Sequence, residues 1–178
     1  LEDEAGMRLA TEHLIELGHT RIGYAGGVPT SESGQRRLAG FLEAMANAKL
    51  TVEPELVTTF GYYPKQGAQA LDAMAELSTP PTAVVVANIN AAHGVLSEAR
   101  RLGIRVPEDM SIVAMHDTWT AEIAWPPLTC VRLPLYELGR AAMASLWENI
   151  NSGTAEDRII ADPAPQLVVR ESTAPPAR

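Results

Sequence analysis

This chain has 178 residues, and the 46% of them that are hydrophobic are enough to bury a substantial core in one domain or slightly more. Its net charge of −8 argues against direct binding to nucleic acid, because affinity for phosphates comes from Lys and Arg. No apolar run approaches the roughly 20 residues that span a bilayer and no secretion signal follows Leu1, so we expect a cytoplasmic protein with no membrane partner.

Helices and strands alternate along the predicted chain. In order, they are a helix at 4–17, a strand at 22–25, a helix at 34–48, a strand at 55–59, a helix at 65–77, a strand at 82–87, a helix at 91–102, strands at 110–115 and 128–131, a helix at 135–151 and an extended segment at 166–170. The helices show apolar residues three and four apart, whereas the strands are short apolar runs bounded by Gly or Pro. This alternation predicts an α/β fold, with a parallel, doubly wound sheet and helices on both faces.

Polar side chains follow several of the predicted strands. The carboxyl ends of parallel strands meet at the edge where open α/β sheets bind ligands. The residues that this rule brings to one edge are Arg37, Tyr62, Tyr63, Asn88, His116 and Asp117, while Ser31 and Ser33 are placed to cap the helix at 34–48. The pattern predicts a small-molecule site at that edge.

Plainer interpretations exist for the same residues. Arg36 and Arg37 can be solvated helix cations, an interpretation that fits Arg36 better because Arg37 lies four residues before the buried Phe41. Exposed aromatic residues next to Gly often only pack their loop, and Asn88 can simply cap the helix that follows it.

Catalytic motifs are missing from the sequence. His116 beside Asp117 and the lone Cys130 have no neighbouring GxSxG elbow or P-loop, and GYAGG after the first strand is not the GxGxxG of dinucleotide-binding proteins. With one cysteine and four scattered histidines, neither a disulfide nor a metal site is expected. We therefore expect a protein that is not an enzyme and needs no cofactor.

Six segments in series carry a family resemblance. They read AGMRLATEHLIELGHTRIGYAGG, RRLAGF, PPTAVVVAN, GIRVPEDMSIVAMHD, PPLTCVRLPLYELGRAA and LVVREST. In this order they resemble signatures of the LacI/GalR class of bacterial transcription repressors, in the effector-binding core. The resemblance covers nearly the whole chain.

The resemblance implies a two-lobed, periplasmic-binding-protein-like fold with the effector held between the lobes. Residues 1–131 and 160–171 would form the C-terminal lobe, 172–178 a tail, and 132–159 a segment whose long helix belongs to an N-terminal lobe absent from this chain. A helix-turn-helix that binds operator DNA would also be absent. Without its partner lobe, the helix at 135–151 would expose an apolar stripe and dock onto another chain, swap or be mobile.

Family contacts can be transferred where positions match. The resemblance implies that Ser33 and Arg37 bind effector hydroxyls, that Tyr62 stacks on the ligand, and that Asn88 makes an amide contact, with Asp117 as an acidic position. His116 stands where the family usually has Asp, and Ile89 also replaces an Asp. Because histidine can donate a hydrogen bond and carry charge, we expect an effector that is not a plain neutral sugar and could bear a carboxylate or phosphate.

A homodimer is also implied by the resemblance. Its interface would include Asn90, His93, Trp119 and Trp125, although the two tryptophans can instead pack over the sheet edge. The sequence therefore predicts the effector-sensing and dimerisation part of a LacI-type regulator, with a small-molecule effector as its ligand. The alternative is a periplasmic sugar-binding protein of a transporter, which shares the fold.

Overall fold

Six strands form one sheet in the order β2-β1-β3-β4-β5-β6. In the computed structural model, which describes residues 1–153 and 159–177, the strands are β1 (Ile22–Ala25), β2 (Val57–Thr58), β3 (Ala83–Val86), β4 (Ser111–Met115), β5 (Thr129–Arg132) and β6 (Gln166–Val168). Neighbouring strands are parallel from β2 to β5, and only β6 runs antiparallel to its neighbour. The predicted α/β fold with a doubly wound sheet is confirmed.

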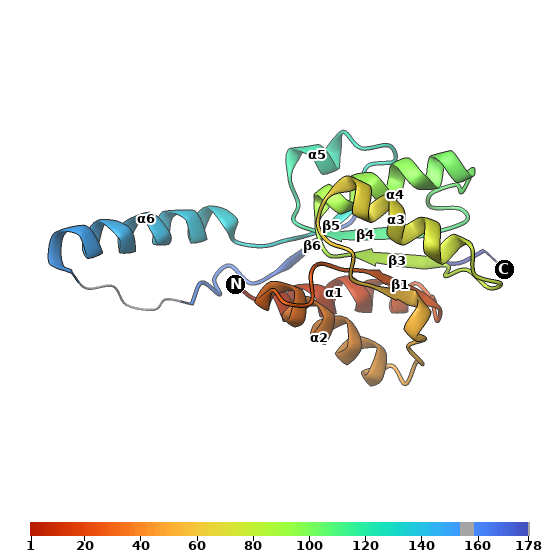
Figure 1. Cartoon of the computed structure of the whole chain (residues 1–178), viewed down its shortest axis with the longest axis horizontal. Coiled ribbons are helices and arrows are strands. Elements are labelled where there is room, and N and C mark those ends of the chain that lie inside the picture. Colours follow the sequence, from red (N-terminus) through yellow and green to blue (C-terminus); the bar gives the residue numbers. More distant parts are fainter. Residues whose placement is uncertain (154–158, 178) are drawn as a thin grey trace.

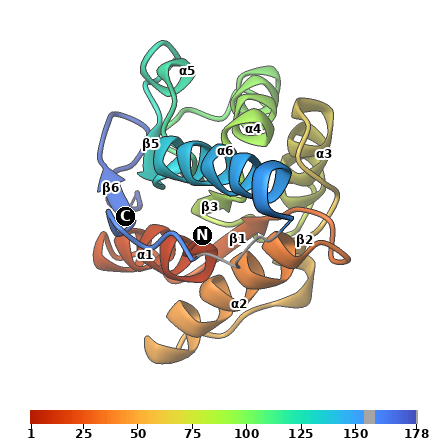
Figure 2. The same cartoon turned by 90° about the vertical axis from the view of Figure 1, so that its left-hand side faces the viewer.

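Helices cover both faces of the sheet (Figures 1 and 2). Their bounds are α1 (Asp3–Glu16), α2 (Glu32–Asn47), α3 (Pro64–Ala75), α4 (Ile89–Leu102), the one-turn α5 (Trp119–Glu122) and α6 (Leu135–Ser152). α1 and α2 pack together on one face, and α3 and α4 on the other (Figure 2). No helix in the part of the chain that the structure describes is long and apolar enough to cross a membrane.

The core has two halves, one on each side of the sheet. Because successive strand residues point to opposite faces, Val84 and Val86 of β3 pack toward α3 and α4, whereas Val85 packs toward α1 and α2. Every residue of β1, β3 and β4 is buried, which explains why their sequences are nearly continuous apolar runs.

Three predicted elements differ in detail. The strand expected at 55–59 starts as a 3-10 turn, η1 (Pro54–Leu56), since Pro54 cannot donate to a sheet ladder and suits the first position of a turn. The extended segment at 166–170 contributes only the antiparallel β6. The segment between the strands predicted at 110–115 and 128–131, for which no element is predicted, contains α5.

The predicted tail at 172–178 is anchored to the sheet. The fully buried Ser172 donates from Oγ to the Ile112 carbonyl at 2.6 Å and accepts from the Thr129 amide at 2.9 Å. Nε2 of His19 lies 2.9 Å from the Ala174 carbonyl oxygen. Residue 178, and residues 154–158 of the segment predicted at 132–159, lie outside the described residues.

α6 extends away from the rest of the molecule (Figure 1). None of its residues is buried. Its large apolar side chains that are exposed are Leu135, Tyr136, Met143, Leu146, Trp147 and Ile150. The exposed stripe expected for this helix is therefore present, although Leu138 at its base is half-buried.

A glycine allows α1 and α2 to approach closely. A Cβ on Gly40 would overlap the carbonyl oxygen of Glu4. We expect Gly40→Ala to lower the free energy of unfolding by about 1–3 kcal/mol, because backbone cannot move aside as a flexible side chain would. Urea unfolding measures this loss.

Gly139→Ala is the matched control. A Cβ at Gly139 in α6 meets nothing within 4 Å, so alanine should leave stability unchanged or raise it by up to about 1 kcal/mol. Equal losses in the two variants would contradict the role assigned to Gly40.

Candidate functional site

Polar and aromatic side chains gather at the carboxyl edge of β1, β3 and β4. Ser31, at the N-cap of α2, accepts from the Gly34 amide at 3.1 Å and so sets the position of this helix after β1. A Cβ on Gly26 would overlap the Tyr24 ring, and one on Gly27 would overlap the Tyr62 ring. The glycine pair therefore lets two aromatic rings lie against the backbone where β1 ends.

Arg37 lies at the centre of this group and is only 6% exposed. Its Nε donates to Oδ1 of Asp3 at 2.7 Å, and its NH1 donates to the Ala87 carbonyl at 2.7 Å. NH2 lies 2.6 Å from the same Asp3 oxygen. Asp3 is equally buried, so the two residues form an ion pair shielded from water.

Tyr62 covers one side of the guanidinium. The guanidinium carbon of Arg37 lies 5.9 Å from the centre of the Tyr62 ring, which is within cation–π range. The Tyr62 hydroxyl lies 3.0 Å from Oγ of Ser31 and 3.3 Å from Oγ of Ser33. The structure thus brings together Ser33, Arg37 and Tyr62, as the sequence predicts.

His116 completes the cluster from the end of β4. Its Nε2 lies 3.1 Å from NH2 of Arg37. Its backbone has φ of +73°, a conformation that non-glycine residues seldom adopt, and its amide donates to the Val131 carbonyl at 2.9 Å. Burial, and then the positive charge of Arg37, lower the pKa of His116 to about 4, against a smaller raising effect of Asp3.

These contacts change the expected electrostatics of the site. The charge of Arg37 is balanced by Asp3, and His116 is neutral at pH 7 because its pKa is lowered. The prediction of an acidic effector relied on a histidine at position 116 that can donate a hydrogen bond and carry positive charge. In the structure the Arg37 cluster has no excess of positive charge, so the electrostatics do not support an acidic effector.

Asn88 and Asp117 have other partners. Oδ1 of Asn88 accepts from the Ala91 amide at 2.8 Å, so it caps α4, as its plainer interpretation proposed. Oδ2 of Asp117 accepts from Nε of Arg132 at 3.0 Å, and its Oδ1 lies 2.7 Å from NH2 of Arg170 without hydrogen-bond geometry. Asp117 thus joins the ends of β5 and β6, outside the Arg37 cluster.

Asp3 is the site residue that sequence reasoning missed. Its only signal was an acidic residue in the first turn of a helix, where carboxylates are common on account of the helix dipole. Pairing with Arg37, 34 residues later, depends on how α1 and α2 cross. No group of three His, Cys, Asp or Glu that could hold a metal ion occurs within residues 1–153 and 159–177.

The residues expected at a dimer interface lie on and beside α4 and α5. Trp119 is 71% exposed and Trp125 is 85% exposed, so neither packs over the sheet edge. Asn90 is exposed, while Nε2 of His93 is buried without a hydrogen-bond partner among the described residues.

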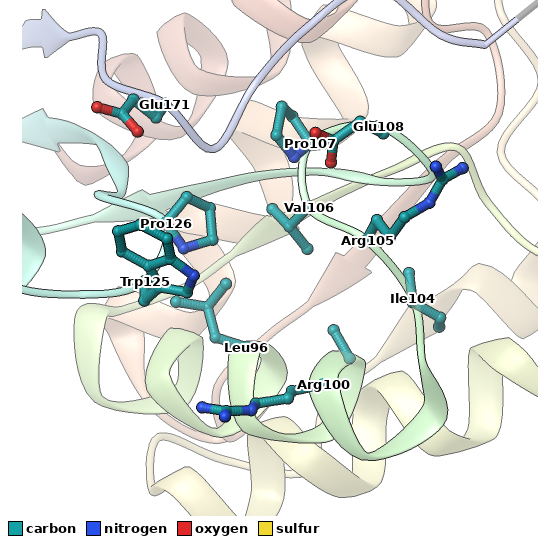
Figure 3. A pocket seen from close by; sticks show the side chains of 11 residues that line it. Leu96, Arg100, Ile104, Arg105, Val106, Pro107, Glu108, Trp125, Pro126 and Glu171 are labelled. Carbon is teal, nitrogen blue, oxygen red and sulfur yellow. The ribbon is translucent and has the colours of Figure 1, made fainter.

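A cavity of about 650 Å³ lies between α4 and the segments that precede β4 and β5 (Figure 3). Leu96 and Arg100 of α4, the segment before β4 that includes Val106, and Trp125 with Pro126 line it. These segments precede β4 and β5, so the cavity is at the amino edge of the sheet. It contains none of the predicted effector-binding residues.

Comparison with known sequences gives a family match. Residues 11–173 match the periplasmic binding protein-like domain. The chain is 41% identical over 178 residues to the HTH-type transcriptional regulator reg1 of Streptomyces lividans, an alignment that covers 97% of this chain and 51% of that protein. It is 36% identical over 170 residues to the HTH-type transcriptional repressor PurR of Haemophilus influenzae, with 94% and 50% covered. The chain spans about half the length of these curated relatives.

Solved structures give the same result. A LacI family transcriptional regulator from Mycobacterium smegmatis matches with a TM-score of 0.95 and 44% identity, over 99% of this chain and 66% of that chain. A structure described as a complex of the transcriptional regulator CelR with cellobiose matches with a TM-score of 0.86 and 32% identity, over 97% and 52%.

The lowered pKa of His116 predicts a pH-dependent stability. Between an unfolded-state pKa of 6.5 and a folded-state pKa of about 4, the unfolded chain binds the proton and the folded chain does not. The free energy of unfolding should therefore fall by up to about 3 kcal/mol from this residue as pH drops through that window.

Urea unfolding at pH 7 and pH 4.5 tests this, with His116→Asn as the comparison. The variant should lose less stability on acidification than the parent. Burial also lowers the pKa of His13, His19 and His93, but these residues are common to both proteins and their effects cancel. The same acid loss in parent and variant would contradict the lowered pKa.

Proposed function

Since the chain belongs to the LacI/GalR family of transcriptional regulators, through its periplasmic-binding-protein-like domain, we propose that it is the effector-sensing part of a DNA-binding regulator. The observation that carries this proposal is the cluster of Arg37, Tyr62 and His116 at the carboxyl edge of the sheet. Open α/β sheets bind ligands at that edge. The role is one of binding, not catalysis, and we place it in the cytoplasm, where operator DNA is available.

The proposed effector is a sugar or sugar-like molecule. Tyr62 offers an aromatic face, and Ser33 and Arg37 offer donors for hydroxyl oxygens. The cellobiose in the CelR structure supports this class of ligand, because that protein shares this fold at 32% identity. Asn88 and Asp117 belong to the wider site in this proposal. The side-chain nitrogen of Asn88 is free of the capping bond, and Asp117 lies outside the Arg37 cluster but follows β4 at the same edge of the sheet.

α6 docks onto an N-terminal lobe of the full-length protein in this proposal. Residues 1–131 and 160–171 form one lobe, and the exposed apolar side chains of α6 lack a covering surface within the described residues. An effector held between the lobes favours one relative orientation of them. It can do so only through a difference in affinity for the two orientations.

A homodimer transmits this change to two DNA-binding heads that lie in the N-terminal part of the full-length protein. The exposed Trp119 and Trp125 support such an interface, because large rigid aromatic side chains commonly anchor protein contacts. Asn90 and His93 belong to the same surface in this proposal. A periplasmic transport protein would share the fold, but the relatives quoted above are all named as transcriptional regulators.

Thermal shift of the full-length protein tests effector binding. Neutral sugars, cellobiose among them, should raise its melting temperature, since a ligand at 100 times its Kd stabilises by about 2.7 kcal/mol. Tyr62→Ala should reduce the shift by removing the aromatic face. The control is Tyr63→Ala, because Tyr63 is 72% exposed and should leave the shift unchanged. The absence of a shift with every sugar would contradict sugar sensing.

Sedimentation of the full-length protein tests the dimer. Trp125→Ala should weaken dimerisation by about 30-fold, the factor that corresponds to an anchor residue worth about 2 kcal/mol. Tyr63→Ala again serves as the control with an exposed aromatic residue removed elsewhere. An unchanged dimer dissociation constant in Trp125→Ala would exclude Trp125 as an anchor.

A further inference from the structure

The contact between Arg37 and His116 determines which ring nitrogen of His116 carries a proton. NH2 of Arg37 lies 3.1 Å from Nε2. A guanidinium stays protonated and can only donate, so Nε2 must accept. The ring then holds its single proton on Nδ1. An aspartate at this position would instead present only acceptor oxygens.

Nδ1–H of His116 is available to a ligand. No described residue accepts a hydrogen bond from it, and the residue is only partly buried. The buried side-chain polar atoms that lack a hydrogen-bond partner among the described residues are Tyr24 Oη, His93 Nε2 and Asp117 Oδ1. Since Nδ1 is not among them, it is a donor that solvent reaches at the edge of the Arg37 cluster.

Backbone hydrogen bonds fix the main chain at His116, and the contact with Arg37 orients the ring. The amides of His116 and Asp117 both donate to the Val131 carbonyl, at 2.9 and 3.2 Å, and maintain the positive φ of His116. Strained residues of this kind persist where the surrounding structure over-determines them, and they cluster at ligand-binding sites. The donor therefore has a defined position before any ligand arrives.

The ion pairs around this donor balance one another. Arg37 is paired with Asp3, both buried. Asp117 is paired with Arg132 and Arg170, and Glu122, 3.6 Å from Arg170, balances the second of these arginines. A ligand carboxylate would place a second anion near Asp3 with one guanidinium to balance both. A ligand ammonium would face only donors from Arg37 and His116. Either unbalanced charge is costly once water is excluded.

We propose that His116 is a specificity-determining residue that donates from Nδ1 to an oxygen of an uncharged, sugar-like effector. The acceptor is a ring, glycosidic, carbonyl or hydroxyl oxygen. The site selects against amino sugars, because an ammonium cannot accept, and against sugar acids, because Asp3 already balances Arg37. This inference rests on the proposed function and names the chemical class of its ligand.

Nitrogen-15 NMR of histidine rings in the full-length protein tests the tautomer without any ligand. The His116 signals, identified by their loss in His116→Asn, should show Nδ1 protonated and Nε2 unprotonated at pH 7. A proton on Nε2, or a doubly protonated ring, would overturn the inference.

Calorimetry with a matched series tests specificity. The probes are glucose, glucosamine and glucuronate, which are neutral, cationic and anionic, together with cellobiose. The unaltered protein should bind a neutral probe at least tenfold more tightly than either charged one. Tightest binding of glucuronate or glucosamine would overturn the inference and leave effector sensing intact. Binding of none of the four would count against sugar sensing and against this inference with it.

Two variants separate the effect of the His116 donor from the effect of the Asp3 charge. His116→Asp should shift relative affinity toward glucosamine by at least tenfold, and aspartate tolerates a positive φ. Asp3→Asn keeps an acceptor for Arg37 but removes the charge, so it should shift preference toward glucuronate. His116→Asn, with the same backbone tolerance, replaces His116→Asp if that variant fails to fold. Unchanged preferences in correctly folded variants would contradict the proposal.

Discussion

The ion pair between Asp3 and Arg37 connects the elements that form the site. Asp3 begins α1, Arg37 lies in α2, and the same guanidinium reaches the Ala87 carbonyl after β3 and His116 after β4. Two buried charges are tolerated only when they are paired and hydrogen-bonded, and removing one partner of such a pair typically costs about 3–5 kcal/mol. The position of Arg37 is therefore set by the whole lobe.

The ion pair also determines which groups of the site remain free to form hydrogen bonds. Most of the guanidinium N–H groups are already used within the protein, so Arg37 acts as an organising group as well as a possible ligand contact. It imposes one tautomer on His116 and supports the face of Tyr62. The donor and the aromatic face are thus positioned by the same buried cation, which reduces the ordering cost of binding.

Two of the groups of exposed apolar side chains within the described residues lie on α6 and around α5. α6 extends from the carboxyl side with Leu146, Trp147 and Ile150 exposed, and the α5 region exposes Trp119 and Trp125 (Figure 1). Contiguous apolar surface of this kind marks interaction sites. These are the two places proposed above for contact with a second lobe and with a second copy of the chain. The Arg37 cluster lies on the same edge of the sheet from which α6 leaves.

Local sequence determined most of the architecture. The period of apolar residues placed α1, α2, α3, α4 and α6 within two residues of their observed ends, and the buried runs placed β1, β3 and β4. Because parallel strands end at one edge, strand order alone brought Arg37, Tyr62 and His116 to a common site. Arg37 and His116 also lie in segments that carry the family resemblance.

Only the tertiary structure decided the partners of those residues. The pairing of Asp3 with Arg37 depends on the crossing of α1 and α2 at Gly40, and the pairing of Asp117 with Arg170 joins residues 53 positions apart. Periodicity carries no information on contacts at such separations. Neighbours distant in sequence also set three other features. These are the direction of β6, the anchoring of Ser172, and the choice of the His116 ring nitrogen that carries the proton.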